Sequence, residues 1–299
     1  MVVVPAHHPS LITAHLLLSM SACRPILKVP PMHHPTTPEA NIPAERRPGH
    51  WVLAELGKKV LRPGGKELTE TLIAALPLRG ADVVEFAPGM GMTAGLLLAQ
   101  QPATYTGVDR DETAVKTVTA AAAGAIPVTV KQASADATGL AAESADVVIG
   151  EAMLTMNNDK QKQAIMQEAF RVLRPGGRYA IHELSMVPDS VDDSVKTQLT
   201  KSLAQAIRVN ARPLTHAEWK HLAESVGFHV VGEYSKPMAL LEPRRMIADE
   251  GLRGMATIAK NLLTKPALRR RVLTMRSTFR THRDHLGAIG LVLEKPATT

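Results

Sequence analysis

Short apolar runs alternate with amphipathic stretches through the middle of the chain. The apolar runs, which predict buried strands, span residues 82–86, 104–108, 126–131, 145–150 and 178–183. The stretches whose apolar residues recur with helical spacing span residues 92–99, 111–122 and 158–173. Strands that alternate with helices predict an α/β fold with a mostly parallel sheet and helices on both of its faces. Such a sheet places its ligands at the carboxyl ends of the strands.

The pattern changes after residue 184. Within residues 185–212, an apolar helical stripe predicts either a lid over the site or a plain packing surface. A capping box at Thr215 and Glu218 predicts the start of a further helix. Residues 228–234 and 288–293 predict two more strands, which makes seven in total. Between them, residues 241–285 form an insertion of helices, whose methionines suit a pliable apolar pocket.

The first part of the chain has a different composition. Residues 1–48 are rich in proline and histidine, which predicts a disordered leader before a single domain at 49–299 with its core at 80–184. An export signal ending at Cys23 is the alternative, but the residues before it include no Lys or Arg, and His15 interrupts the apolar run. We therefore expect a cytoplasmic protein.

A hexapeptide, Val-Leu-Arg-Pro-Gly-Gly, occurs at residues 60–65 and again at 172–177. The apolar spacing of residues 51–61 predicts a helix before the first copy, and residues 67–75 predict a second helix after it. We interpret the two copies as independent turns that follow helices. Alternatively, the first copy closes one end of the ligand site.

Composition excludes several classes of protein. The hydrophobic content is 45% and the formal charge is +7, as in a globular protein with a moderate basic excess. Aromatic residues make up 3%, too few for the stacking platforms of single-strand nucleic-acid binders. The single cysteine excludes an internal disulfide and a Cys-x-x-Cys site. Apolar runs of membrane-spanning length do not occur.

Small and acidic residues lie at the predicted carboxyl ends of the strands. Gly89 and Gly91 follow the first strand, and Asp109 follows the second, where an acid can accept both hydroxyls of a ribose. Asp136 and Ala137 follow the third strand, at the position for a purine. Glu85 lies inside the first strand, where a buried carboxylate is costly unless it orders the loop or meets a cation. S-adenosylmethionine brings two cationic groups, whereas the pyrophosphate of a dinucleotide brings negative charge.

Five ordered segments carry a resemblance to a known family. They are Glu-Phe-Ala-Pro-Gly-Met-Gly at 85–91, Gly-Val-Asp at 107–109, Asp-Ala-Thr-Gly-Leu at 136–140, Ser-Ala-Asp-Val-Val at 144–148 and Arg-Val-Leu-Arg-Pro-Gly-Gly at 171–177. Residues 82–184 thereby resemble class I S-adenosylmethionine-dependent methyltransferases that act on small molecules, the group that includes quinone C-methyltransferases. The resemblance implies a Rossmann-like sheet of seven strands, with the last strand antiparallel and inside the sheet.

The resemblance also implies which residues bind the cofactor, S-adenosyl-L-methionine. These are Glu85, Ala87, Pro88, Gly89, Gly91, Asp109, Arg110, Asp136, Ala137 and Glu151. Ala87 departs from the family pattern, which has glycine there, and alanine cannot adopt every backbone angle open to glycine. We therefore keep open a non-catalytic descendant of the family, and also a nicotinamide-dependent oxidoreductase that uses the same turn.

Two residues are candidates for catalysis. His182 follows the fifth strand, and a histidine can take a proton from an acceptor near neutral pH. Glu151 follows the fourth strand and is suited to orient His182 or to bind an acceptor hydroxyl. Both residues can instead be structural. We expect no metal, because a site formed by His182, Glu183 and Glu151 lacks a diagnostic spacing.

Residues 265–283 are strongly basic, with apolar residues on the opposite side of the predicted helix. A solvated helix face is the simplest interpretation. Contact with an anionic membrane surface or with an acidic partner are the alternatives. Nucleic acid is disfavoured, because no nucleic-acid-binding module surrounds the basic residues.

Overall fold

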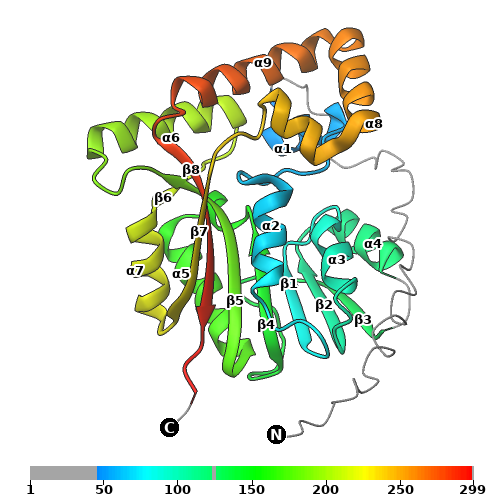
Figure 1. Ribbon diagram of the computed structural model, residues 1–299, viewed down its shortest axis with the longest axis vertical. Helices are drawn as coiled ribbons and strands as arrows, with labels where there is room; N and C mark the ends of the chain where they lie inside the picture. The colour runs from blue at the N-terminus through cyan, green and yellow to red at the C-terminus, as the bar shows by residue number, and fades with distance from the viewer. Residues whose placement is uncertain (1–45, 123–125, 298–299) are drawn as a thin grey trace, which may run out of the picture.

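The centre of the molecule is a mixed sheet of eight strands, in which seven follow the order β3-β2-β1-β4-β5-β8-β7 and the short β6 pairs with β5 (Figure 1). The computed structural model describes residues 46–122 and 126–297, and its strands are β1 (Asp82–Phe86), β2 (Thr104–Asp109), β3 (Val128–Gln132), β4 (Ala145–Glu151), β5 (Leu173–Met186), β6 (Leu214–Thr215), β7 (His229–Pro237) and β8 (Leu286–Glu294). β8 is antiparallel to both of its neighbours, β5 and β7. The predicted Rossmann-like fold with an antiparallel last strand inside the sheet is confirmed.

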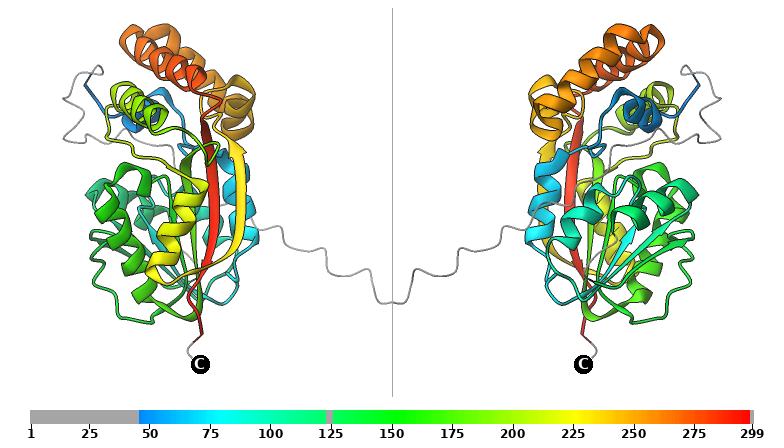
Figure 2. Two further views of the ribbon diagram at one scale, coloured as in Figure 1. Left: turned by 90° about the vertical axis from the view of Figure 1, so that its left-hand side faces the viewer. Right: turned by 90° about the vertical axis from the view of Figure 1, so that its right-hand side faces the viewer.

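Helices cover both faces of the sheet (Figure 2). One face packs against α2 (Gly65–Ala74), α3 (Met92–Leu98) and α4 (Glu112–Ala121), and the other against α5 (Asp159–Val172) and α7 (His216–Val226). Val83 packs on the face covered by α2, α3 and α4, and its neighbour Val84 packs on the face covered by α5 and α7. Successive side chains of a strand point to opposite faces of the sheet, so this alternation is expected. A strand buried on both faces reads as a continuous apolar run, which is why β1 and β4 are readable from sequence.

A separate helical layer lies beyond the carboxyl ends of β1, β4 and β5, at the end of the molecule opposite the C-terminus (Figures 1 and 2). We call this layer the cap; it consists of α1 (Gly49–Leu56), α6 (Asp193–Ile207), α8 (Pro243–Thr264) and α9 (Pro266–Thr281). Its helices share one apolar cluster, in which Leu199, Leu203 and Met275 are fully buried. The predicted helices of the lid and of the insertion therefore form one body.

Two local predictions differ from the structure. The predicted helix at 51–61 ends at Leu56, because Gly57 adopts a left-handed conformation with φ 101° that closes the helix. The two hexapeptide copies also diverge. In the first, Gly64 and Gly65 begin α2, whereas in the second Leu173 is already extended and starts β5. The same hexapeptide thus adopts different conformations in two tertiary contexts.

Other predictions concern the ends of elements. The capping box is present: the Thr215 hydroxyl accepts from the Glu218 amide, and the Glu218 carboxylate accepts from the Thr215 amide. β6 was not predicted, since a strand of two residues is too short to show alternation. The predicted leader, except for its last three residues, and Cys23 lie outside the described residues. Among the helices of the described chain, none combines the length and the apolar character that crossing a membrane requires.

Candidate active site

The loop between β1 and α3 adopts an unusual backbone. Ala87, Gly89 and Gly91 have φ values of 53°, 55° and 76°, in the left-handed region. The Asp109 carboxylate, at the end of β2, accepts the Gly89 amide at 3.0 Å and the Asp111 amide at 3.0 Å. Asp109 therefore holds the loop in place, and the structure brings these predicted cofactor positions to one edge of the sheet.

Ala87 is strained, because a left-handed conformation costs an L-residue about 1–2 kcal/mol. We expect Ala87→Gly to raise the free energy of unfolding by about 0.5–1 kcal/mol, once the greater freedom of glycine in the unfolded chain is subtracted. Ala99→Gly is the matched control: Ala99 is exposed with φ −64°, so the same change there should lower stability. Urea unfolding measures both variants, and equal effects of the two substitutions would contradict the assignment of strain.

Glu85 lies at the base of this loop, 4% exposed, and its carboxylate accepts a hydrogen bond of 2.6 Å from the Tyr105 hydroxyl. Burial raises the pKa of Glu85 to about 8, and the nearby Glu151 carboxylate acts in the same direction. In the absence of a cationic ligand, Glu85 is therefore mostly protonated at neutral pH. A cation that binds beside Glu85 favours loss of this proton, and the ionised carboxylate then attracts the cation.

Glu151 is the centre of a hydrogen-bonded cluster at the end of β4. Its carboxylate accepts from Arg62 Nε at 2.9 Å, from the Thr69 hydroxyl at 2.6 Å, from His182 Nδ1 at 2.9 Å and from the Thr93 hydroxyl. Burial favours its protonated form, but the Arg62 guanidinium and the bonds from His182 and Thr69 outweigh this effect and lower the pKa of Glu151 to about 2. Glu151 is thus a fixed negative charge, in contrast to Glu85.

His182 is fully buried, and both of its ring nitrogens have partners. Nε2 accepts the Gly64 amide proton at 2.9 Å, which places the ring proton on Nδ1, 2.9 Å from Glu151. A Cβ added at Gly64 would lie 2.8 Å from Nε2, so a glycine is required for this approach. In this arrangement neither nitrogen is open to a substrate proton, which favours a positioning role for His182 over the predicted role as a base.

Arg62, Thr69 and Thr93 were not singled out from the sequence. Arg62 is 8% exposed and also bonds the Thr93 hydroxyl at the first turn of α3. The repeated hexapeptide was the available signal, since its first copy contains both Arg62 and Gly64. The open alternative that this copy closes one end of the site agrees with its contacts.

Contacts from the cap fix this first copy. Lys58, Asp249 and Glu250 have side chains no more than 1% exposed, and Lys58 Nζ lies 3.5 Å from Asp249 and 3.3 Å from Glu250. The Glu250 carboxylate also accepts the Lys59 and Val60 amides, each at 3.0 Å. α8 therefore anchors the segment that leads to Arg62.

The other predicted residues lie around this centre. Asp136 and Ala137 form an exposed turn after β3, and Arg110 is exposed beside Asp109. Glu183 faces away from Glu151, and its carboxylate accepts the amides of residues 153–155 at 2.8–3.0 Å. Within residues 46–122 and 126–297, no group of three or more His, Cys, Asp or Glu side chains is arranged to hold a metal ion.

Comparisons with known proteins agree with this geometry. Residues 83–177 match a family described as a methyltransferase domain. A protein of Haemophilus influenzae, itself uncharacterized, is 36% identical over 251 residues, which cover 83% of this chain and 98% of that protein.

Solved structures show the same fold. The MccD protein superimposes with a TM-score of 0.62 at 18% identity, over 79% of this chain and 100% of that one. The cyclopropane synthase MmaA2 from Mycobacterium tuberculosis gives 0.59 at 13% identity, over 76% and 82%. A phosphoethanolamine N-methyltransferase 2 from Haemonchus contortus, solved with phosphomonomethylethanolamine and S-adenosylhomocysteine, gives 0.60 at 16% identity, over 83% and 56%.

The matched domain, the fold and the loop geometry together define the class of protein. The chain belongs to the same family as the Haemophilus influenzae protein, and its residues 83–177 are a methyltransferase domain with the Rossmann-like fold of methyltransferases of known structure.

Proposed function

We propose that this protein transfers the methyl group of S-adenosyl-L-methionine to a small, partly apolar molecule. The observation that carries the proposal is the pairing of the left-handed loop with two acids of different character, Glu85 and Asp109. Asp109 has the position for the ribose hydroxyls, and Glu85 lies beneath the loop to receive positive charge. The Haemonchus contortus relative, solved with S-adenosylhomocysteine, supports the choice of cofactor.

The charges of the site match a zwitterionic amino acid. Glu85 and Glu151 offer carboxylates to an ammonium or a sulfonium group, and the Arg62 guanidinium offers a partner for a carboxylate. We assign the adenine end to Asp136, Ala137 and Arg110, which lie at the exposed turns after β3 and β2. A pyrophosphate fits this site less well, because the Glu151 carboxylate is ionised and would repel it.

When bound, the cofactor supplies a methyl group on positively charged sulfur, which is already activated for displacement. The chain then needs chiefly to hold the acceptor in line and to exclude water. The apolar cap lies over the carboxyl ends of the strands and suits both tasks. We assign Glu151 to orient the acceptor or the cofactor, and His182 to position Glu151.

Cofactor binding tests the proposal directly. Isothermal titration with S-adenosylhomocysteine should give a saturable signal, and Asp109→Ala should weaken it by about 100-fold or more, since two hydrogen bonds to a charged group are lost. Glu112→Ala, an exposed acid on α4, should leave the affinity unchanged. A folded protein that binds no cofactor, or binding that is indifferent to Asp109→Ala, would reject the proposal in favour of a non-catalytic role.

The raised pKa of Glu85 makes a second prediction. At pH 7 the free protein holds a proton on Glu85, whose pKa is about 8, and a cationic ligand favours the ionised form. Binding of a cationic ligand at pH 7 should therefore release protons, and this coupling should strengthen binding as the pH rises towards 8. Titrations in phosphate and in Tris, whose ionisation enthalpies differ, count the protons. Glu85→Gln should abolish the release, and a wild-type protein that releases none would contradict the assignment.

A nicotinamide-dependent oxidoreductase is the second candidate from the sequence. It predicts that the protein quenches the fluorescence of reduced nicotinamide dinucleotides, and we expect no quenching. Since the cofactor that we assign is an intracellular metabolite, we place the protein in the cytoplasm.

A further inference from the structure

We propose that the outer face of α8 and α9 docks on an anionic bilayer surface. This inference does not depend on methyl transfer, because it rests on the charge and the exposed side chains of the cap.

The first observation is the distribution of charge. Residues 243–285 contain eleven Lys and Arg residues and three Asp and Glu residues, an excess of eight positive charges, whereas the whole chain has a net charge of +7. The basic excess of the protein is therefore concentrated in this segment. Two of its three acids, Asp249 and Glu250, are buried against Lys58 and the backbone, so they do not neutralise the outer face.

The second observation is the exposure of large apolar side chains. Six such side chains are exposed in the described part of the chain, and four of them lie on α8 and α9: Ile247 (46%), Leu252 (81%), Leu263 (77%) and Leu273 (53%). Leu252 and Leu263 lie in the C-terminal half of α8 and are eleven residues apart. Eleven residues make about three helical turns, so the two side chains lie on one side of the helix. Arg253 and Lys260, which are exposed and seven residues apart, lie on the same half of α8.

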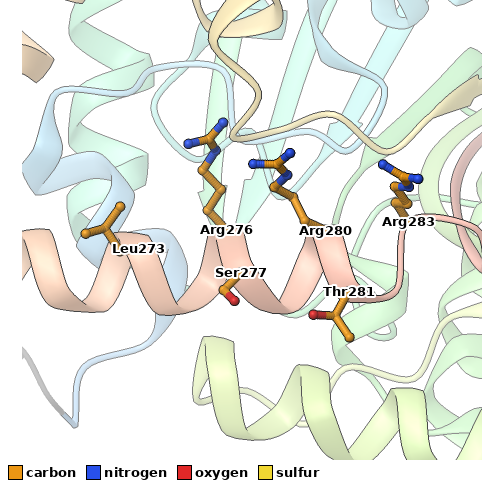
Figure 3. A pocket seen from close by; sticks show the side chains of 6 residues that line it. All are labelled: Leu273, Arg276, Ser277, Arg280, Thr281 and Arg283. Carbon is orange, nitrogen blue, oxygen red and sulfur yellow. The ribbon is translucent and has the colours of Figure 1, made fainter.

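The third observation is a basic groove along α9 (Figure 3). Arg276, Arg280 and Arg283 project to one side of the helix, and with Leu273 they line a groove of about 450 Å³. The same three arginines border a second hollow of about 250 Å³, whose lining also includes the apolar side chains of Met238 and Phe279.

The acids near this groove leave it positive. Arg276 and Arg280 share one carboxylate, that of Glu242, at 3.4 and 3.7 Å. Arg283 lies 3.5 Å from Asp284, but both side chains are at least 70% exposed, so water screens this pair. Guanidinium groups above an apolar floor suit phosphate headgroups with the first part of their acyl chains.

A bilayer fits this surface better than a folded acidic partner. Leucines that stand singly among arginines, on helices at the outer end of the molecule, match the interfacial pattern of peripheral membrane proteins (Figure 2). A protein partner would instead require a contiguous complementary patch. Cationic side chains near an anionic surface contribute about a tenfold or smaller gain in binding each, and the gain falls with salt.

Co-sedimentation with vesicles tests the proposal. The full-length protein should bind vesicles of mixed phosphatidylcholine and phosphatidylglycerol, and should bind pure phosphatidylcholine vesicles weakly. The triple variant Arg276→Ala, Arg280→Ala, Arg283→Ala should bind the mixed vesicles on the order of 100-fold more weakly at low salt. Circular dichroism establishes that this variant is folded.

Two further variants separate charge from apolar contact. The first is a triple variant that removes the same charge from exposed positions on the sheet domain: Arg79→Ala, Lys116→Ala, Lys160→Ala. It should bind the mixed vesicles as the wild type does. Leu252→Ser, Leu263→Ser alters only exposed side chains and should weaken binding even if the arginine variant fails to fold. The proposal would be overturned if the protein bound both vesicle types equally, or if the sheet-domain variant lost as much vesicle binding as the arginine variant. Binding to soluble polyglutamate but not to vesicles would also overturn it.

Discussion

Replacing Glu151 by alanine should lower the free energy of unfolding by about 3 kcal/mol, because it leaves the buried Arg62 guanidinium without its carboxylate. The Thr69 and His182 donors would lose their acceptor as well. The folded-state pKa of Glu151, about 2, lies below its ordinary value of 4.5, so the stabilisation is present above pH 4.5 and is lost as the pH falls towards 2. Urea unfolding at pH 7 and at pH 3 measures both effects.

A double variant separates charge pairing from shape. Removing both partners, with Glu151→Leu and Arg62→Met, should recover much of the stability, because no buried charge remains unpaired. Binding of S-adenosylhomocysteine should not recover, since the polar cluster is gone. If Glu151→Ala alone costs less than about 1 kcal/mol, the cluster is not coupled as the distances indicate.

Lys58→Met should destabilise the protein by about 3–5 kcal/mol, because two buried carboxylates on α8 would face each other without a counter-charge. Residues 58–61 lead to Arg62 and Gly64, so this variant should also weaken cofactor binding, although Lys58 itself is not assigned to the cofactor site. Thermal unfolding and titration with S-adenosylhomocysteine provide the two measurements.

Lys59→Met is the matched control for this prediction. Lys59 is the next residue and its side chain is exposed, although its backbone amide also binds Glu250. The substitution should change stability by no more than about 0.5 kcal/mol. Comparable losses at positions 58 and 59 would mean that the burial of Lys58 does not govern the anchoring of the segment.

Much of the sheet and its ligand edge could be predicted from the sequence. Parallel strands are buried on both faces, so β1, β4 and β5 show as apolar runs. Asp109 lies at the carboxyl end of β2, Glu151 at that of β4 and His182 near that of β5. The rule that ligands meet those ends requires no knowledge of side-chain contacts. It therefore identified the edge of the site without identifying the role of each residue.

The contacts that give these residues their roles are long-range. His182 is closed off by the Gly64 amide, 118 positions earlier in the chain, and no local pattern indicates that approach. Arg62 belongs to a hexapeptide that occurs twice, and only the first copy is anchored by α8. The cap is similar: Arg271 lies in the same basic run as its exposed neighbours, yet it is buried and donates to the Ala206 carbonyl.

The position of β8 has a consequence for the order in which the protein acquires its structure. β7 reaches the sheet through β8, and β8 follows all the other strands in the sequence. Until β8 has been made, β7 has no partner in the sheet and β5 carries an open edge, so α8 and α9, which lie between β7 and β8 in the chain, lack the strand that connects them to the sheet. The α/β half can form during synthesis, but the enclosure above the ligand edge must wait until β8 has been made.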